Sequence, residues 1–193
     1  MSDPLVLASS SPRRRDLLSI AGIPFEIHVP EVDESCELPA ESAVAELSRR
    51  KALACRQTFP ERFILAADTL VALDGVKLGK PVDREDACRM LRLLSGRTHH
   101  VFTGITVLTP EGAVLTETDT SSVTFVSVTE SEIIDYVESG EPMDKAGAYA
   151  IQGRAALWIR QMSGSPSGVI GLPLALVRSL LIRGGYPLLM RKL

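Results

Sequence analysis

The sequence contains few cysteines and no long apolar run. Cys36, Cys55 and Cys88 are odd in number and show no CxxC spacing, which argues against a disulfide framework and against a zinc ribbon. No stretch approaches the roughly 18 consecutive apolar residues of a membrane-spanning helix, and residues 1–4 do not resemble a signal peptide. We therefore expect a cytoplasmic protein without a membrane partner.

An excess of basic charge is also lacking. The chain has 21 basic and 24 acidic side chains, for a net charge of −3, whereas proteins that bind nucleic acid through bulk charge are usually basic. We therefore expect a small-molecule partner and no nucleic acid. With 45% apolar and 23% charged residues, the composition is that of a globular protein, and its length suits one domain, which we place at 1–193.

Hydrophobic periodicity and turn signals predict a mixture of helices and strands. Asp83 is a candidate N-cap, and Thr129 with Glu132 is a candidate capping box. Because the elements do not alternate strictly, we predict an α/β fold with a mixed sheet flanked by helices. The expected helices are 12–21, 41–55, 84–94, 130–137 and 173–183, and the expected strands are 5–8, 25–29, 63–73, 101–108, 113–126 and 156–160, with a loop at 163–168.

Asp68 is the most informative polar residue, because it lies inside the apolar run 63–73 (FILAADTLVAL). A carboxylate buried there without a partner would be costly to desolvate. Two explanations are open. The side chain marks a strand end or bulge and accepts a hydrogen bond from a backbone amide, or it faces a cleft at the end of a central strand, where metal and substrate compensate its charge.

Lys51 occupies a helix position where an apolar residue is expected. It shares one face of the predicted helix 41–55 with Val44, Leu47 and Cys55. One explanation is that the aliphatic stem packs on this face while the ammonium reaches water, which is common for lysine. The other is that the charge faces a binding site.

The segment 9–15 (SSSPRRR) joins a buried strand to a helix N-terminus, where Ser11 can cap the helix and Pro12 suits its first turn. Free amides, the helix dipole, hydroxyls and guanidinium groups together favour phosphate. Consecutive helical residues point about 100° apart, so one or two of the arginines must lie on the surface or in salt bridges. A capped helix with a solvated basic first turn has the same pattern.

Two polar segments, 79–81 (GKP) and 144–153 (DKAGAYAIQG), place a lysine near glycine, which allows close approach of a ligand. Either one alone is typical of an ordinary loop. Together with Arg13, Lys51 and Asp68 they supply several cations and one buried acid, which suits a polyphosphate.

The histidines and the tryptophan do not indicate further chemistry. His28, His99 and His100 lack the spacing of metal ligands, and we expect them to be exposed strand residues. Trp158 is expected in the core.

Five motifs, in order along the chain, resemble those of the Maf family of nucleoside triphosphate pyrophosphatases: 7–14 (LASSSPRR), 67–69 (ADT), 78–81 (LGKP), 144–153 (DKAGAYAIQG) and 171–174 (GLPL). The resemblance implies an inosine triphosphatase-like fold with a twisted sheet and two lobes around a cleft. It implies hydrolysis between the α and β phosphates, with release of a monophosphate and pyrophosphate and with Mg²⁺ or Mn²⁺ as cofactor. It also implies a homodimer.

Residues 144–153 resemble the branch of the family that prefers dTTP and UTP. The resemblance implies that Asp68 accepts the proton, with Lys51 and Lys80 as further catalytic residues, and that Glu34 and Asp68 hold the metal. It assigns substrate binding to Ser9, Arg13, Arg14, Thr69, Lys145 and Gln152, of which Arg13, Thr69 and Gln152 set the base preference. Two alternatives stay open: an enzyme of the 7-methyl-GTP branch, and a nucleotide sensor or division regulator without turnover.

Overall fold

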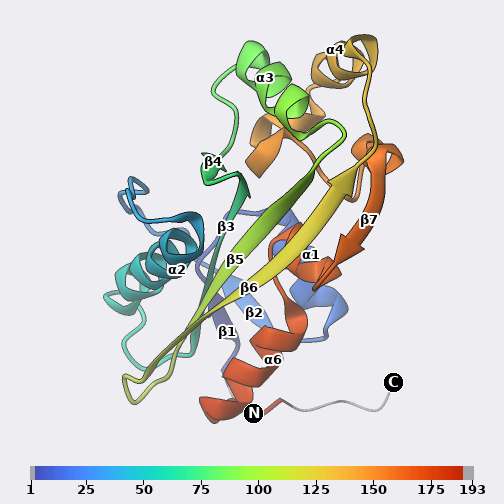
Figure 1. Cartoon of the computed structure of the whole chain (residues 1–193). Coiled ribbons are helices and arrows are strands. Elements are labelled where there is room, and N and C mark those ends of the chain that lie inside the picture. The colour runs from blue at the N-terminus through green and yellow to red at the C-terminus, as the bar shows by residue number, and fades with distance from the viewer. Residues whose placement is uncertain (1–2, 189–193) are drawn as a thin grey trace.

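A computed structural model describes residues 3–188, which form a seven-stranded mixed sheet with helices on both faces (Figure 1). The strands are β1 Leu5–Leu7, β2 Phe25–Ile27, β3 Ile64–Leu73, β4 Val76–Leu78, β5 Thr98–Leu108, β6 Val114–Phe125 and β7 Ile159–Ser163. The helices are α1 Pro12–Ile20, α2 Ala40–Arg56, α3 Arg84–Leu94, α4 Glu130–Glu138, α5 Pro166–Ile170 and α6 Leu174–Arg183. Short 3₁₀ helices η1, η2 and η3 cover Glu141–Asp144, Ala146–Ala148 and Arg154–Trp158.

The strand order is β2-β1-β3-β5-β6-β7, with β4 paired to β3. β1 runs parallel to β2 and β3, and the other pairs are antiparallel. The predicted fold class is therefore confirmed. Within residues 3–188, no helix combines the length and apolar character that crossing a bilayer requires.

Side chains of β3 alternate between the two faces of the sheet. Leu65 and Ala67 pack in the core beside α1 and α6, whereas Ile64 and Ala66 pack in the core beneath α2. Continuation of this alternation places Asp68 on the α2 face. Its neighbour Thr69 consequently lies on the opposite face.

The edge of β3 that faces β1 has a break in its pairing. β3 pairs there with β1 at Ile64 and Leu65 and with β4 from Val71 to Leu73. Among the described strands, none pairs with 66–70 on this side. Side chains from both faces of β3 can therefore reach one opening at this edge.

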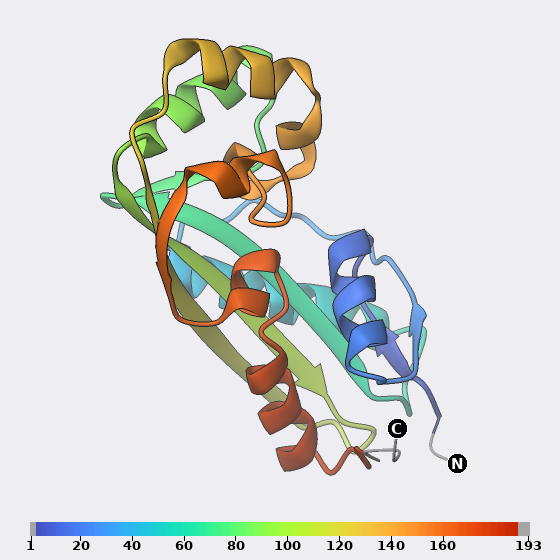
Figure 2. The same ribbon diagram turned by 90° about the vertical axis from the view of Figure 1, so that its right-hand side faces the viewer.

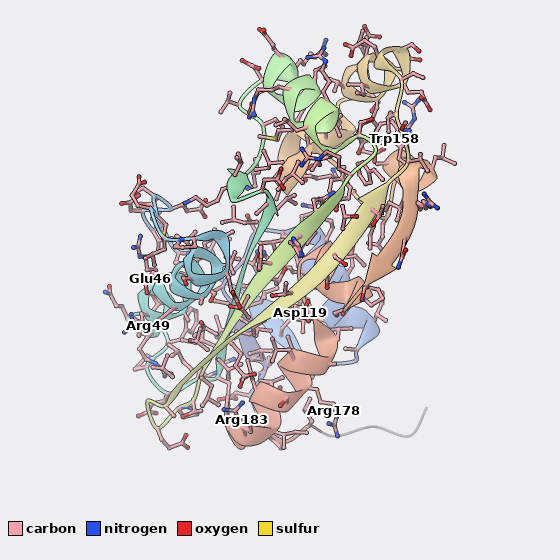
Figure 3. All side chains as sticks on the ribbon, viewed as in Figure 1. Glu46, Arg49, Asp119, Trp158, Arg178 and Arg183 are labelled. Atoms are coloured by element: carbon pink, nitrogen blue, oxygen red, sulfur yellow. The ribbon has the colours of Figure 1, made fainter. Side chains whose placement is uncertain are left out.

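Several elements gather at the two ends of the long strands, and α2 packs across β3 and β5 between these ends (Figure 1). α3, α4 and the 3₁₀ helices lie at one end, whereas β1, β2 and α6 lie toward the other (Figures 1 and 2). Trp158, which is only 6% exposed as expected for a core residue, lies at the α3 and α4 end (Figure 3). Separate apolar cores occupy the two parts, in agreement with the predicted lobes.

Two local predictions near the C-terminus were wrong. The expected strand 156–160 is mostly η3, because a 3₁₀ turn buries Ala155 and Trp158, three positions apart, on one side. The expected loop 163–168 contains the start of α5, where the side chain of Ser165 accepts a hydrogen bond from the Gly168 amide at 3.0 Å.

The prediction that His99 is exposed was also wrong. β5 begins at Thr98, so His99 alternates inward together with Val101 and is fully buried. Two of the three predicted helix caps are confirmed: the Asp83 side chain accepts from the Asp86 amide, and Thr129 forms the capping box of α4.

Candidate active site

A cavity of about 510 Å³ lies where the loop after β1, α2, β3 and residues 144–152 meet. It therefore opens at the break in the pairing of β3. All site residues expected from the sequence line this cavity: Ser9, Arg13, Arg14, Glu34, Lys51, Asp68, Thr69, Lys80, Lys145 and Gln152.

Lys51 joins two carboxylates at the base of the cavity. Its Nζ lies 2.6 Å from Asp68 Oδ1 and 2.7 Å from Glu34 Oε1. The side chains of Lys51 and Asp68 are each only 13% exposed, so the ammonium does not extend into bulk water. The partner of Asp68 is this ammonium and not a backbone amide. The hydrogen bond from Lys51 lowers the pKa of Glu34 despite its partial burial.

Asp68 uses one carboxylate oxygen for this ion pair. Its second oxygen, Oδ2, accepts no hydrogen bond from any residue within 3–188. Because Asp68 also lines the cavity, one oxygen of a buried carboxylate is available to a ligand. A second oxygen of this kind can accept a proton or bind a cation.

The carboxylates of Glu34 and Asp68 fit a divalent metal. Each carboxylate directs one oxygen to the Lys51 ammonium, and the other oxygen of each has no partner among the described residues, so these second oxygens could hold a cation beside the ammonium. Within the described residues, no group of three or more His, Cys, Asp or Glu side chains could hold a metal by itself. Magnesium is commonly held by one or two carboxylates, with substrate phosphates and water as the other ligands.

Arg14 connects three parts of the cavity wall through its guanidinium group. Nε donates to the Gly171 carbonyl at 2.8 Å, Nη1 to Ser9 Oγ at 3.0 Å and Nη2 to Thr69 Oγ1 at 3.1 Å. Burial lowers the pKa of Arg14, but an arginine stays protonated in proteins. The contact also gives a physical reason for the motif at 171–174, whose first carbonyl accepts from Arg14.

The bonding of Ser9 leaves it only one way to bind a ligand. Its Oγ accepts from Arg14 Nη1 at 3.0 Å and from the Ser11 amide at 3.2 Å. A hydroxyl has two lone pairs and one proton, so only the proton remains free. Ser9 can therefore donate to a ligand oxygen. The Ser11 side chain, expected to cap α1, makes no capping hydrogen bond.

The hydroxyl of Thr69 differs from that of Ser9 in the hydrogen bond that it can offer a ligand. Thr103 Oγ1 donates to the Gly168 carbonyl at 2.9 Å, so the 3.0 Å contact between the hydroxyls of Thr103 and Thr69 needs the proton of Thr69. Thr69 also accepts from Arg14. It therefore offers a ligand only an acceptor lone pair. The roles of Thr103 and Gly168 were not anticipated from the sequence, because they depend on the register between β3 and β5.

The arginines at the start of α1 point in different directions, as predicted. Arg14 is turned inward, Arg15 is exposed, and Arg13 lies at the cavity wall and forms an ion pair. Arg13 Nη1 lies 2.9 Å from Asp144 Oδ2, and Lys145 Nζ lies 2.5 Å from the other oxygen of Asp144.

Lys80 and Gln152 are available to a ligand. Among the described residues, Lys80 has no acidic partner within ion-pair distance, and the exposed side chain of Gln152 makes no hydrogen bond. Lys80 is nevertheless close enough to Glu34 to contribute to the lowering of that carboxyl's pKa.

A buried pair of side chains supports the loop that carries Gln152. Tyr149 lines the cavity, and its hydroxyl lies 2.8 Å from His99 Nε2. Burial lowers the pKa of His99 to about 4, so the imidazole is neutral at pH 7. The pairing of His99 with Tyr149 was also not predicted from the sequence. Position 147 of the same loop requires glycine, because φ is +69° there and a Cβ at this position would lie 2.9 Å from the side chain of Val71.

Comparison with known proteins relates this chain to one family over nearly its whole length. Residues 4–183 match the family model described as Maf-like protein. The chain is 47% identical over 173 residues to a dTTP/UTP pyrophosphatase of Geobacillus sp. (strain WCH70), covering 89% of this chain and 92% of the relative. It is 48% identical over 187 residues to a protein of the same name from Symbiobacterium thermophilum, covering 95% of each.

Solved structures with low sequence identity share the fold. The Ham1 protein of Staphylococcus aureus superposes with a TM-score of 0.56 at 15% identity, covering 94% of this chain and 99% of that chain. A HAM1 protein of Coxiella burnetii gives a TM-score of 0.52 at 16% identity, covering 95% and 100%. These similarities concern the fold alone.

Proposed function

This chain belongs to the Maf family, and from that premise we propose that it hydrolyses nucleoside triphosphates, preferably dTTP and UTP, to a monophosphate and pyrophosphate. The names of its relatives support this substrate choice. The observation that carries the proposal is a single cavity in which Asp68, with one free carboxylate oxygen, lies among several cationic side chains.

The cationic side chains suit the triphosphate. Lys80 and Lys145 supply ammonium groups, and Ser9 supplies a hydroxyl that can only donate, which matches a phosphate oxygen. Ser9 and Lys145 are held by hydrogen bonds before the substrate arrives, so they stabilise the charge that develops on the leaving pyrophosphate with little reorganisation.

The hydrogen-bonding polarity of Thr69 suits uracil and thymine. Both bases present a ring N–H between two carbonyls, and Thr69 offers only an acceptor, which can take this N–H. The amide of Gln152 can donate to one of the neighbouring carbonyls. Cytosine lacks the ring N–H at this position, so the same contacts disfavour CTP.

Asp68 is the general base of the proposed reaction. Its free oxygen takes a proton from the water that attacks the α phosphorus, the bond from that phosphorus to the bridging oxygen breaks, and the electron pair leaves with pyrophosphate. Lys51 holds the other oxygen of Asp68 at 2.6 Å and so orients the carboxylate. A divalent cation held by Glu34 and Asp68 would supply further neutralisation of phosphate charge.

The experiment is a substrate panel with product identification. The purified protein is given dTTP, UTP, CTP, dATP, GTP and 7-methyl-GTP, with Mg²⁺, with Mn²⁺ or with a chelator, and monophosphate and pyrophosphate are quantified. We expect the fastest pyrophosphate release from dTTP and UTP and none with the chelator. Tight binding without release would instead support a nucleotide sensor, and a preference for 7-methyl-GTP would assign the other branch.

A further inference from the structure

We propose that Asp144 is a positioning residue, whose carboxylate bridges Arg13 and Lys145 at the wall of the cavity and holds both cations in the orientation that binds the nucleotide. This inference rests on the proposed function. Neither the sequence motifs nor the family roles assigned above give Asp144 a part of its own.

Each oxygen of Asp144 contacts a different cation. Oδ2 lies 2.9 Å from Arg13 Nη1, and Oδ1 lies 2.5 Å from Lys145 Nζ. Arg13 belongs to the first turn of α1, whereas Lys145 lies between η1 and η2. Among the described residues, this is the one ion pair that joins α1 to residues 141–153.

The bridge leaves donors free on both cations. Lys145 Nζ donates to Asp144 Oδ1 and to the Glu141 carbonyl, each at 2.5 Å, so one of its three N–H groups remains. The two contacts fix the direction of that third N–H. The Arg13 guanidinium likewise has N–H groups to spare, because it has five and its contacts with Asp144 use two.

The charges around Asp144 also indicate that its carboxylate orients Arg13 and Lys145 and does not keep a triphosphate away from them. One carboxylate between two cations leaves a net positive charge toward the cavity, so the bridge still attracts a triphosphate. Burial tends to raise the pKa of Asp144, but the hydrogen bonds from Lys145 and Arg13 outweigh it and lower that pKa, so the carboxylate stays ionised. The side chain of Asp144 is 59% exposed, which implies a small contribution to folding stability.

The test compares Asp144→Asn with a matched control, Asp74→Asn. Asp74 also forms an exposed ion pair, with Arg97, and does not line the cavity. We expect Asp144→Asn to raise KM for dTTP about 10-fold and to lower kcat less than about 3-fold, because the cations are retained but no longer oriented. Asp144→Glu should recover part of the loss, and Asp74→Asn should match the wild type.

A double variant shows whether Asp144 acts through Arg13. In the Arg13→Ala background, Asp144→Asn should raise KM by clearly less than in the wild-type background. An unchanged or lower KM in Asp144→Asn would overturn the proposal. It would mean that the carboxylate has no effect on substrate binding or competes with the substrate for the two cations. A lower melting temperature with unchanged affinity would also overturn it, since the role would then be structural.

Calorimetric binding of α,β-methylene-dUTP separates this inference from the proposed function. If the wild type binds this analogue but releases no pyrophosphate from any triphosphate, the proposed function fails. The affinities of wild type, Asp144→Asn and Asp74→Asn for the analogue still decide the role of Asp144. Equal affinities would refute the positioning role, and weaker binding confined to Asp144→Asn would support it.

Discussion

Asp68 on β3 lies directly opposite Gly104 on β5 in the register of the sheet. The backbone of α2 crosses over this pair so closely that a Cβ at Gly104 would lie 2.2 Å from the carbonyl oxygen of Val44. A residue without a side chain thus lets α2 approach the strand that carries Asp68. This close approach allows Lys51, two turns further along α2, to reach the carboxylate.

Gly104→Ala tests this arrangement. The added methyl group would overlap the α2 backbone, so we expect the free energy of unfolding to fall by roughly 2 kcal/mol or more. Turnover should fall as well, because α2 carries Lys51. Urea unfolding and pyrophosphate release measure the two effects. Gly79→Ala is the control for stability, because an added Cβ there meets nothing within 4 Å. Equal stability of both variants would mean that α2 is not held in this way.

Asp68→Asn removes the proposed base while keeping the shape of the side chain. We expect a nearly unchanged melting temperature and a fall in kcat of about 10³-fold, the size of effect that general base catalysis supplies. Thermal unfolding and initial rates of pyrophosphate release check the two expectations. Near-normal turnover in this variant would refute the role of Asp68.

Lys51→Met removes the ammonium between two carboxylates. Because Asp68 and Glu34 lose their shared partner at a largely buried position, the free energy of unfolding should fall by about 2 kcal/mol. Adding Asp68→Asn should recover most of this loss, since the remaining buried group is neutral. Urea unfolding of the single and double variants measures both. If the double variant were less stable than Lys51→Met, the loss would not come from an unpaired charge.

The parts of the site that could be predicted were those with a local signal in the sequence. Asp68 interrupts an apolar run, and Lys51 interrupts the apolar face of a helix, so each was recognised from its immediate neighbours. The structure places the two side chains in contact, a pairing that neither pattern specifies. The main helices and strands were likewise predictable, because hydrophobic periodicity extends over many residues.

The parts that were missed depend on contacts between distant segments. Thr103 contacts Thr69 because the two residues are paired in the register of β5 and β3, which periodicity does not determine. His99 is buried because β5 begins earlier than its apolar residues indicate. The short helix α5 was missed because its few residues resemble a polar turn.

The Arg14→Lys variant tests whether the three hydrogen bonds of the Arg14 guanidinium stabilise the cavity. An ammonium keeps the charge but cannot reproduce the planar contacts to Gly171, Ser9 and Thr69. We expect a loss of roughly 1–3 kcal/mol in the free energy of unfolding, from buried groups left without partners, together with a higher KM. Arg15→Lys, at an exposed position, is the control and should change neither quantity. Wild-type behaviour of Arg14→Lys would show that only the charge matters.

The buried pair of His99 and Tyr149 predicts a specific dependence of stability on pH. Burial lowers the pKa of His99 from 6.5 to about 4, so between these values the unfolded chain binds a proton that the folded protein does not. This contribution is fully present above pH 6.5 and is lost as the pH falls toward 4, and it amounts to about 3 kcal/mol. Urea unfolding at about pH 7 and about pH 4.5 measures it.

Variants of His99 and His100 separate the contribution of His99 from that of the carboxylates, which also titrate in acid. His99→Gln should lose less stability on acidification than the wild type, whereas His100→Gln, at the neighbouring exposed position, should stay close to the wild type, because its charge is only the smaller cause of the lowered pKa of His99. Because Tyr149 lines the cavity and His99 is its hydrogen-bond partner, His99→Gln should also alter KM for dTTP. If all three proteins lost the same stability between the two pH values, His99 would not be held neutral in the folded protein, and the loop would need another explanation for its position.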